Sequence, residues 1–165
     1  MSVTDELLRN AESYAASFDK ADLPSAPGKN VAVVACMDTR LSPYAILGLT
    51  EGDAHVIRNA GGVVTDEEIR SLAISQHLLG TEEIVLIQHT RCGLLSFTDE
   101  EFAARLESET GIRPDWSAHA FDDLEESVRR QIRRIEESPF IPRKDVRGFI
   151  YDVDTGTLRE VDAGA

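Results

Sequence analysis

Apolar runs along the chain alternate with stretches that have helical spacing. The continuous run Val31–Ala35 is typical of a strand buried on both faces of a parallel sheet, and Ile84–Ile87 repeats the pattern. Polar or reactive residues follow both runs, so the predicted strands end at Cys36 and at Gln88-His89. Further strands are expected at His55–Arg58, Val146–Val153 and Leu158–Val161, the last two joined as a hairpin.

The N-terminal stretch has the periodicity of an amphipathic helix. We expect this helix over residues 4–18, with Thr4 as the capping residue. Its apolar side chains fall on one face, here called the N-terminal stripe: Leu7, Leu8, Ala11, Tyr14, Ala15 and Phe18. Because none of these residues carries chemistry, the stripe predicts packing, with the helix acting as a dimerisation arm.

Later helices are marked by their start signals. Ser42-Pro43 opens one helix, and apolar spacing predicts another through Leu124–Ile135. Two capping boxes place the starts of two more helices, at Thr65/Glu68 and Thr98/Glu101. Strands that alternate with helices predict an α/β fold with a mainly parallel β-sheet and flanking helices. No linker divides the chain, so residues 1–165 are expected to form a single domain.

Composition narrows the classes of function. Of the 165 residues, 42% are hydrophobic, which is typical of a globular chain. The net charge of −13 disfavours nucleic acid and anionic membranes as partners. No apolar stretch approaches the roughly 18 residues of a membrane span, and the polar N-terminus lacks a secretory pattern, so a cytoplasmic location is expected. Thiols stay reduced there, so the two cysteines are expected to be free or metal-bound.

The only two cysteines lie just after two predicted strands. Cys36 ends the first apolar run, while His89 and Cys92 follow the other, three residues apart, a spacing that lets one turn present both to one ion. Ligands of open α/β sheets bind at the carboxyl ends of strands, where these residues lie. Two thiols and an imidazole are the usual ligand set of a zinc ion with one open position.

Charged residues accompany the first cysteine. Asp38 and Arg40 lie two and four residues after Cys36, and on an extended segment the three side chains point the same way. Arg58-Asn59 ends the second predicted strand. Polar residues therefore stand at three strand ends, where this fold class places active sites.

Other interpretations of the cysteines stay open at this point. A single cysteine is most often a small buried hydrophobe. A disulfide between Cys36 and Cys92 is geometrically possible but is disfavoured by the compartment. A Cys–His nucleophile would leave the second cysteine unexplained. The joint pattern favours the metal site.

Taken together, the motifs resemble those of the β-class carbonic anhydrases, and most closely the short bacterial and archaeal branch. The resemblance rests on Cys36-x-Asp38-x-Arg40, Arg58-Asn59-Ala60-Gly61-Gly62 and His89-x-x-Cys92-Gly93, and it runs from about Val31 to Val153. It implies a catalytic zinc-binding domain with a parallel-centred sheet. It also implies a homodimer or a dimer of dimers, with the site near the subunit interface.

By this resemblance the protein is a carbonate dehydratase with one Zn²⁺ per chain, held by Cys36, His89 and Cys92. Zinc-bound hydroxide would attack CO2 and give bicarbonate and a proton, reversibly. Asp38 would either occupy the fourth zinc position or be held off by Arg40, in which case it orients the hydroxide. The substrate pocket implied consists of Arg58, Asn59, Ala60 and Gly61.

Two other functions fit the same residues. One is hydrolysis of a CO2-like molecule, carbon disulfide or carbonyl sulfide, on the same scaffold. The other is a zinc-binding regulatory protein without turnover, against which the intact Asp38–Arg40 dyad argues. One departure from the branch is Arg91, at a position that is often acidic. Its cation would stabilise the thiolate or bicarbonate, or point to solvent.

Overall fold

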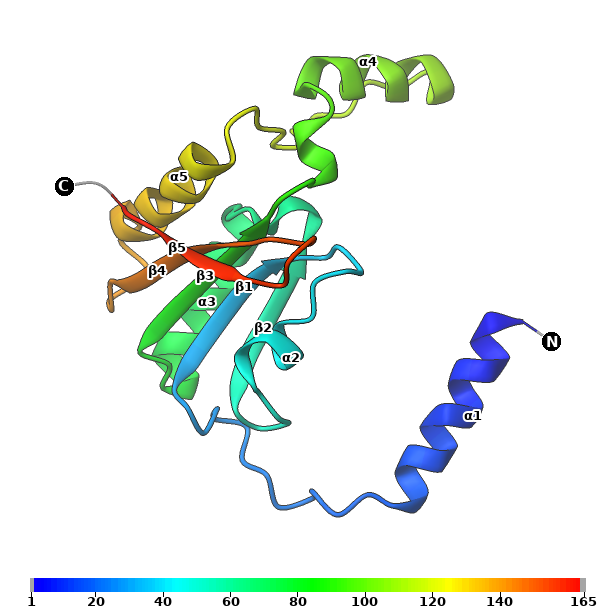
Figure 1. Cartoon of the computed structure of the whole chain (residues 1–165), viewed down its shortest axis with the longest axis vertical. Helices are drawn as coiled ribbons and strands as arrows, with labels where there is room; N and C mark the ends of the chain where they lie inside the picture. The colour runs from blue at the N-terminus through cyan, green and yellow to red at the C-terminus, as the bar shows by residue number, and fades with distance from the viewer. Residues whose placement is uncertain (1, 164–165) are drawn as a thin grey trace.

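The computed structural model describes residues 2–163, and a five-stranded sheet forms its centre (Figure 1). The strands are β1 (Val31–Cys36), β2 (Ala54–Asn59), β3 (Glu83–His89), β4 (Asp145–Tyr151) and β5 (Leu158–Val161). They lie in the order β2-β1-β3-β4-β5, with the first four parallel and β5 antiparallel to β4. The expected mainly parallel α/β sheet and the C-terminal hairpin are therefore confirmed.

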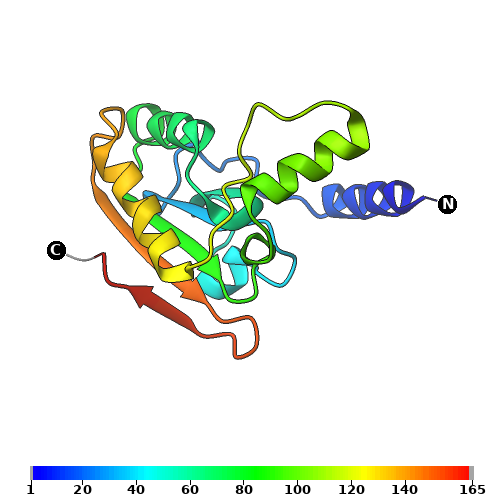
Figure 2. The ribbon, with the colours of Figure 1, turned by 90° about the horizontal axis from the view of Figure 1, so that it is seen from above.

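Helices cover both faces of this sheet (Figure 2). The helices are α1 (Val3–Ala16), α2 (Pro43–Leu47), α3 (Asp66–Leu79), α4 (Asp99–Thr110) and α5 (Leu124–Glu137), with 3-10 turns η1 (Ala60–Gly62) and η2 (Gly93–Leu95). Apolar residues of α3 and α5 pack on one face and those of α2 on the other. Strand β1 is thereby buried from both sides, which explains why its sequence is an unbroken apolar run.

A glycine in β4 sets how closely α5 lies on the sheet. A Cβ atom at Gly148 would overlap Val128 and lie 2.9 Å from Ile132, both buried residues of α5. Any side chain at this position would therefore push the helix away. The close contact fixes β4, which borders the strand that carries His89.

The helix starts follow the sequence signals, with one correction. Ser42, Thr65 and Thr98 cap α2, α3 and α4 as expected. Thr4, in contrast, lies inside the first turn of α1, because Ser2 caps this helix and forms a reciprocal capping box with Asp5. The helix also ends at Ala16, before the expected residue 18.

Helix α1 stands apart from the sheet in both views of the ribbon (Figures 1 and 2). It buries no residue within the chain, and Leu7 and Phe18 of the N-terminal stripe are 60% and 50% exposed. Tyr14 donates a hydrogen bond to Glu51 at 2.5 Å, which ties the helix to the segment before β2. Among residues 2–163, no helix has the length and hydropathy needed to cross a bilayer.

Candidate metal centre

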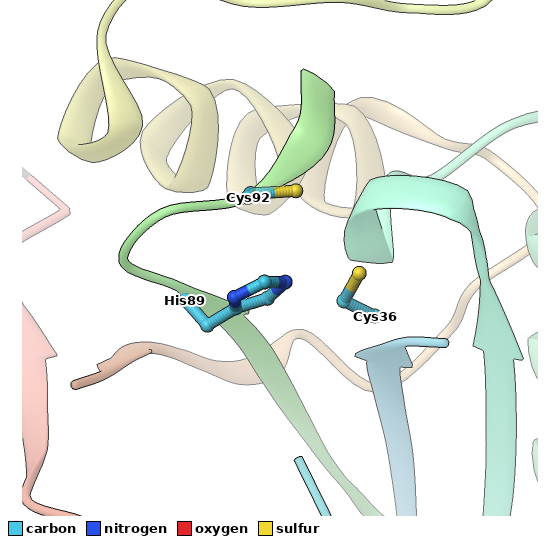
Figure 3. Close-up of side chains that lie close together, drawn as sticks. All are labelled: Cys36, His89 and Cys92. Atoms are coloured by element: carbon cyan, nitrogen blue, oxygen red, sulfur yellow. The ribbon is translucent and has the colours of Figure 1, made fainter. Parts of the chain in front are cut away.

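Three side chains with ligand atoms meet at the carboxyl ends of β1 and β3 (Figure 3). The sulfur atoms of Cys36 and Cys92 and a ring nitrogen of His89 all lie within 4.8 Å of one another. All three residues are buried. They come together because β1 and β3 are parallel neighbours, so strand ends that are far apart in sequence share one edge of the sheet.

A sharp turn brings Cys92 back towards His89. Between them Arg91 adopts a left-handed backbone conformation with φ of 56°. Cys92 itself is extended, with φ −65° and ψ 140°, and it begins the short turn η2. This turn therefore lets His89 and Cys92, three residues apart in the sequence, reach the same centre.

The histidine is oriented as a metal ligand would be. Its Nδ1 lies 2.9 Å from the carbonyl oxygen of Thr90, so Nδ1 carries the proton and Nε2 is the free acceptor. Nε2 of His89 is buried and has no hydrogen-bond partner within the part of the chain described. A buried polar atom without a partner costs free energy, whereas a metal ion would satisfy it. Together with two thiols, this nitrogen fits zinc.

The surroundings favour a thiolate at Cys36. A hydrogen bond from Cys92, opposed by burial, lowers the pKa of the Cys36 thiol to about 4. The backbone N–H groups of Asp38 and Gly61 act in the same direction. The same hydrogen bond raises the pKa of Cys92, since that thiol retains the shared proton. A metal cation would replace this proton and bind both sulfurs as thiolates.

Asp38 and Arg40 form a close pair beside these ligands. Nε of Arg40 donates to Oδ1 of Asp38 at 2.9 Å and Nη2 donates to Oδ2 at 2.7 Å, a bidentate arrangement. Arg40 therefore holds the pKa of the Asp38 carboxyl well below its usual range. Oδ2 of Asp38 also lies 3.8 Å from Nε2 of His89. The carboxylate of Asp38 thus lies close to the metal centre, but its hydrogen bonds to Arg40 hold it away from the ligand position.

The pairing arises from a turn and not from an extended strand. Strand β1 ends at Cys36, and the chain turns at Thr39-Arg40. The backbone N–H of Arg40 donates to Oδ1 of Asp38 at 2.9 Å, which is an Asx turn. The sequence correctly placed the two charges near Cys36, but the expected strand alternation through Arg40 is wrong.

Arg58 holds the loop that carries the pair. Its guanidinium donates to the carbonyl oxygen of Cys36 at 3.0 and 2.7 Å. The same group donates to the carbonyl oxygens of Asp38 and Leu41, each at 2.8 Å. The donors of Arg58 are thus directed at backbone carbonyl oxygens. Its expected place in the substrate pocket stays a prediction.

A buried glutamine was not singled out in the sequence. Gln88 is 1% exposed, and its Nε2 donates to the carbonyl oxygen of Gly61 at 2.7 Å. Because the N–H of Gly61 acts on Cys36, this contact steadies a turn that touches the metal centre. The available signal was a polar residue closing an otherwise apolar strand, directly before His89.

The turn after β2 is tightly packed. A Cβ atom at Gly62, whose φ is 60°, would lie 2.8 Å from the backbone nitrogen of Cys36 and 2.9 Å from the carbonyl oxygen of Ile87. Asn59 closes the turn by exchanging hydrogen bonds with the backbone of Val63, at 2.7 and 3.1 Å. The glycine is needed because η1 crosses the ends of β1 and β3.

A largely apolar cavity of about 490 Å³ lies beside this turn. Asn59 and Ala60 of the predicted pocket line it, whereas Arg58 and Gly61 are not among its lining residues. The other wall is formed by Leu94, Phe97, Phe102 and Trp116. The cavity thus offers an apolar surface next to the strand that ends beside Cys36.

Arg91 is turned away from the sulfur atoms. Its side chain is 63% exposed, and Nη1 lies 2.5 Å from Oδ1 of Asp154 in the β4–β5 turn. Its backbone carbonyl oxygen, in contrast, accepts a hydrogen bond from Nη2 of Arg40 at 3.2 Å. The cation therefore pairs with a carboxylate and does not contact either thiol.

Comparisons with known proteins agree on one family. The carbonic anhydrase family model matches residues 31–158. The chain is 56% identical to beta-carbonic anhydrase 1 of Mycobacterium tuberculosis, over 98% of this chain and 99% of the relative. It is 36% identical to a carbon disulfide hydrolase of an Acidianus species, over 94% and 87%. The crystal structure of carbonic anhydrase from Streptococcus mutans superposes with a TM-score of 0.92 at 46% identity, covering 98% and 99% of the two chains.

Proposed function

The chain belongs to the β-class carbonic anhydrase family, and we propose that it carries out the reversible hydration of CO2 to bicarbonate and a proton at the Cys36–His89–Cys92 centre. The observation that carries the proposal is the unpartnered, buried Nε2 of His89, which lies among two thiols. Zinc bound there would lower the pKa of a coordinated water and so supply hydroxide for attack on CO2.

Asp38 has the role of hydrogen-bond acceptor for the attacking water. The carboxylate is ionised because Arg40 lowers its pKa, so it can only accept a hydrogen bond. Accepting the proton of a hydroxide fixes the direction of the lone pair that attacks the substrate carbon. Arg40 keeps Asp38 in this place through two hydrogen bonds and so prevents the carboxylate from becoming a fourth ligand itself.

The apolar cavity beside η1 suits a small neutral substrate. Ala60 and Leu94 contribute apolar surface to it, and Asn59 is one of the polar residues that line it. CO2 carries no charge, so the net charge of −13 does not hinder its approach. The same charge repels bicarbonate, which favours its departure once it has formed.

We further propose that the active protein is a homodimer or a dimer of dimers. Helix α1 exposes its apolar stripe and buries nothing within its own chain, so a second copy is the surface that this stripe fits. The reduced state of the thiols that the centre requires also supports the expected cytoplasmic location.

Hydrolysis of carbon disulfide is the weaker interpretation. The chain is 36% identical to a carbon disulfide hydrolase but 56% identical to a carbonic anhydrase over nearly its full length. The two assays separate the functions directly. Stopped-flow measurement is expected to show CO2 hydration by the zinc-loaded protein. The same protein is expected to release no sulfide from carbon disulfide. Sulfide release without CO2 hydration would overturn the proposal.

A further inference from the structure

The negative charges of two carboxylates act on Arg40. It makes a bidentate pair with Asp38, and its Nη2 also reaches the carbonyl oxygen of Arg91 at 3.2 Å. The second carboxylate is Asp154, whose negative charge acts on Arg40 less strongly than that of Asp38. In the structure Asp154 is instead paired with the guanidinium of Arg91 at 2.5 Å.

The position of Asp154 relative to the centre is fixed by the backbone. The N–H of Thr90 donates to the carbonyl oxygen of Tyr151 at 2.9 Å, and the N–H of Val153 donates to Oγ1 of Thr90 at 3.1 Å. The N–H of Asp154 donates to Oδ1 of Asp152 at 2.8 Å, which shapes the β4–β5 turn. The turn that carries Asp154 is therefore fastened to the loop between His89 and Cys92.

We propose that Arg91 is a positioning residue, which acts on the centre by neutralising Asp154 so that Arg40 stays on Asp38. This inference rests on the proposed function of the Asp38–Arg40 pair. Without the cation of Arg91, Asp154 is an unpaired carboxylate near Arg40 and competes for it. Each departure of Arg40 frees Asp38 to move onto the metal centre, where it takes the place of the attacking water.

The effect is expected to be modest. Arg91 and Asp154 are 63% and 60% exposed, and exposed ion pairs are screened by solvent. The competition is nevertheless between two carboxylates for one guanidinium, so a small change in charge is enough to shift the share of Asp38 that Arg40 holds. The shift should shrink as salt is added, because screening weakens the field of Asp154.

Four variants test the proposal: Arg91→Gln, Arg91→Lys, Asp154→Asn and the double variant Arg91→Gln/Asp154→Asn. The exposed side chains make misfolding a small risk, which circular dichroism checks. Two readouts are used, the CO2 hydration rate against pH and the visible spectrum of the cobalt(II)-substituted protein against pH. A metal that carries water has a spectrum that changes with pH, whereas one capped by Asp38 does not.

Arg91→Gln is expected to lower the hydration rate about two- to fivefold near pH 7.5 and to move the spectral midpoint about 0.3 to 0.7 units to higher pH. Asp154→Asn is expected to match the wild type, because it removes the competitor. The double variant is expected to return to wild-type behaviour, and Arg91→Lys to retain most of it.

Three results would overturn the proposal. If Arg91 only latched the two loops together, Asp154→Asn and the double variant would be impaired as much as Arg91→Gln. If its cation acted directly on the substrate or the thiolates, the double variant would stay impaired while Asp154→Asn remained normal. Wild-type behaviour of Arg91→Gln would exclude any role. A wild-type protein without CO2 hydration would refute the proposed function instead, and the cobalt spectra would still decide the role of Arg91.

Discussion

Oδ2 of Asp38 lies 3.8 Å from Nε2 of His89, yet the same oxygen accepts a 2.7 Å hydrogen bond from Arg40. Oδ2 of Asp38 can therefore have either of two partners. It can serve as a ligand beside His89, which would block the fourth metal position, or it can remain with Arg40 and leave that position to water. The structure has the second arrangement.

Metal content should depend on Cys92. The purified protein is expected to bind about one zinc per chain, and Cys92→Ser is expected to lose most of it, because a hydroxyl is a far poorer zinc ligand than a thiolate. Atomic absorption after dialysis measures both. Thr90→Ser serves as a control, since it lies in the same turn and keeps both the hydroxyl that accepts from Val153 and the backbone carbonyl that orients His89. Full zinc occupancy in Cys92→Ser would remove Cys92 from the ligand set.

Activity should be low near neutral pH and rise into the mildly alkaline range. Two thiolates offset the charge of zinc, so the attacking water should ionise at higher pH than at a centre of three neutral histidines. Asp38 should not add a step to this profile. Its pKa is lowered from an ordinary 3.8, so the pair with Arg40 is intact above that value and is lost only as pH falls through the lowered pKa. An acidic step that vanished in Asp38→Asn would contradict this assignment.

The N-terminal stripe should hold two subunits together. Replacing Leu7 and Phe18 by serine is expected to convert the oligomer to monomer at micromolar concentration, since both side chains are at least half exposed in the single chain. Arg9→Ala, on the opposite side of α1, is the matched control and should leave the oligomer unchanged. Light scattering that reports a wild-type monomer would refute the dimer.

Gln88 should matter more for the metal than for stability. Its Oε1 has no partner among the described residues, so Gln88→Met removes one unpaired acceptor while leaving another, the carbonyl oxygen of Gly61. We expect the free energy of unfolding to change by less than about 1 kcal/mol, with zinc lost faster to a chelator.

Gln76→Met is the control for Gln88. Both ends of the Gln76 amide bond to the backbone of Arg143 at 3.0 Å, so its loss should cost about 1–3 kcal/mol of stability without changing zinc release. Equal zinc release from wild type and Gln88→Met would show that the glutamine only fills space.

The sequence alone predicted those parts of the fold that local signals determine. Apolar runs located β1 and β3, and capping boxes located the starts of α3 and α4. The grouping of Cys36, His89 and Cys92 was predictable because each follows a strand end at the same edge of the sheet. The cap of α1 was misplaced because Ser2 and Thr4 are both good capping residues, and only the reciprocal bond with Asp5 decides between them.

Other features depend on contacts that no local pattern reveals. The Asx turn that joins Asp38 to Arg40 was hidden by the assumption of an extended segment. Arg58 and Gln88 act on backbone carbonyls that lie 17 or more residues away in sequence, so their targets appear only once the chain has folded. The pairing of Arg91 with Asp154 is of the same kind, at a separation of 63 residues.

Crystal structures of zinc-loaded Asp38→Ala and Arg40→Ala, solved at one pH and paired with their CO2 hydration rates, test the central claim most directly. Both variants should retain about one zinc, because three ligands remain, and both should lose roughly 10- to 100-fold in rate. They should differ at the metal. In Arg40→Ala the freed carboxylate of Asp38 should occupy the fourth position, whereas in Asp38→Ala that position should hold water. Wild-type rates in both variants, with Asp38 away from the metal in Arg40→Ala, would show that the pair neither gates nor assists the reaction.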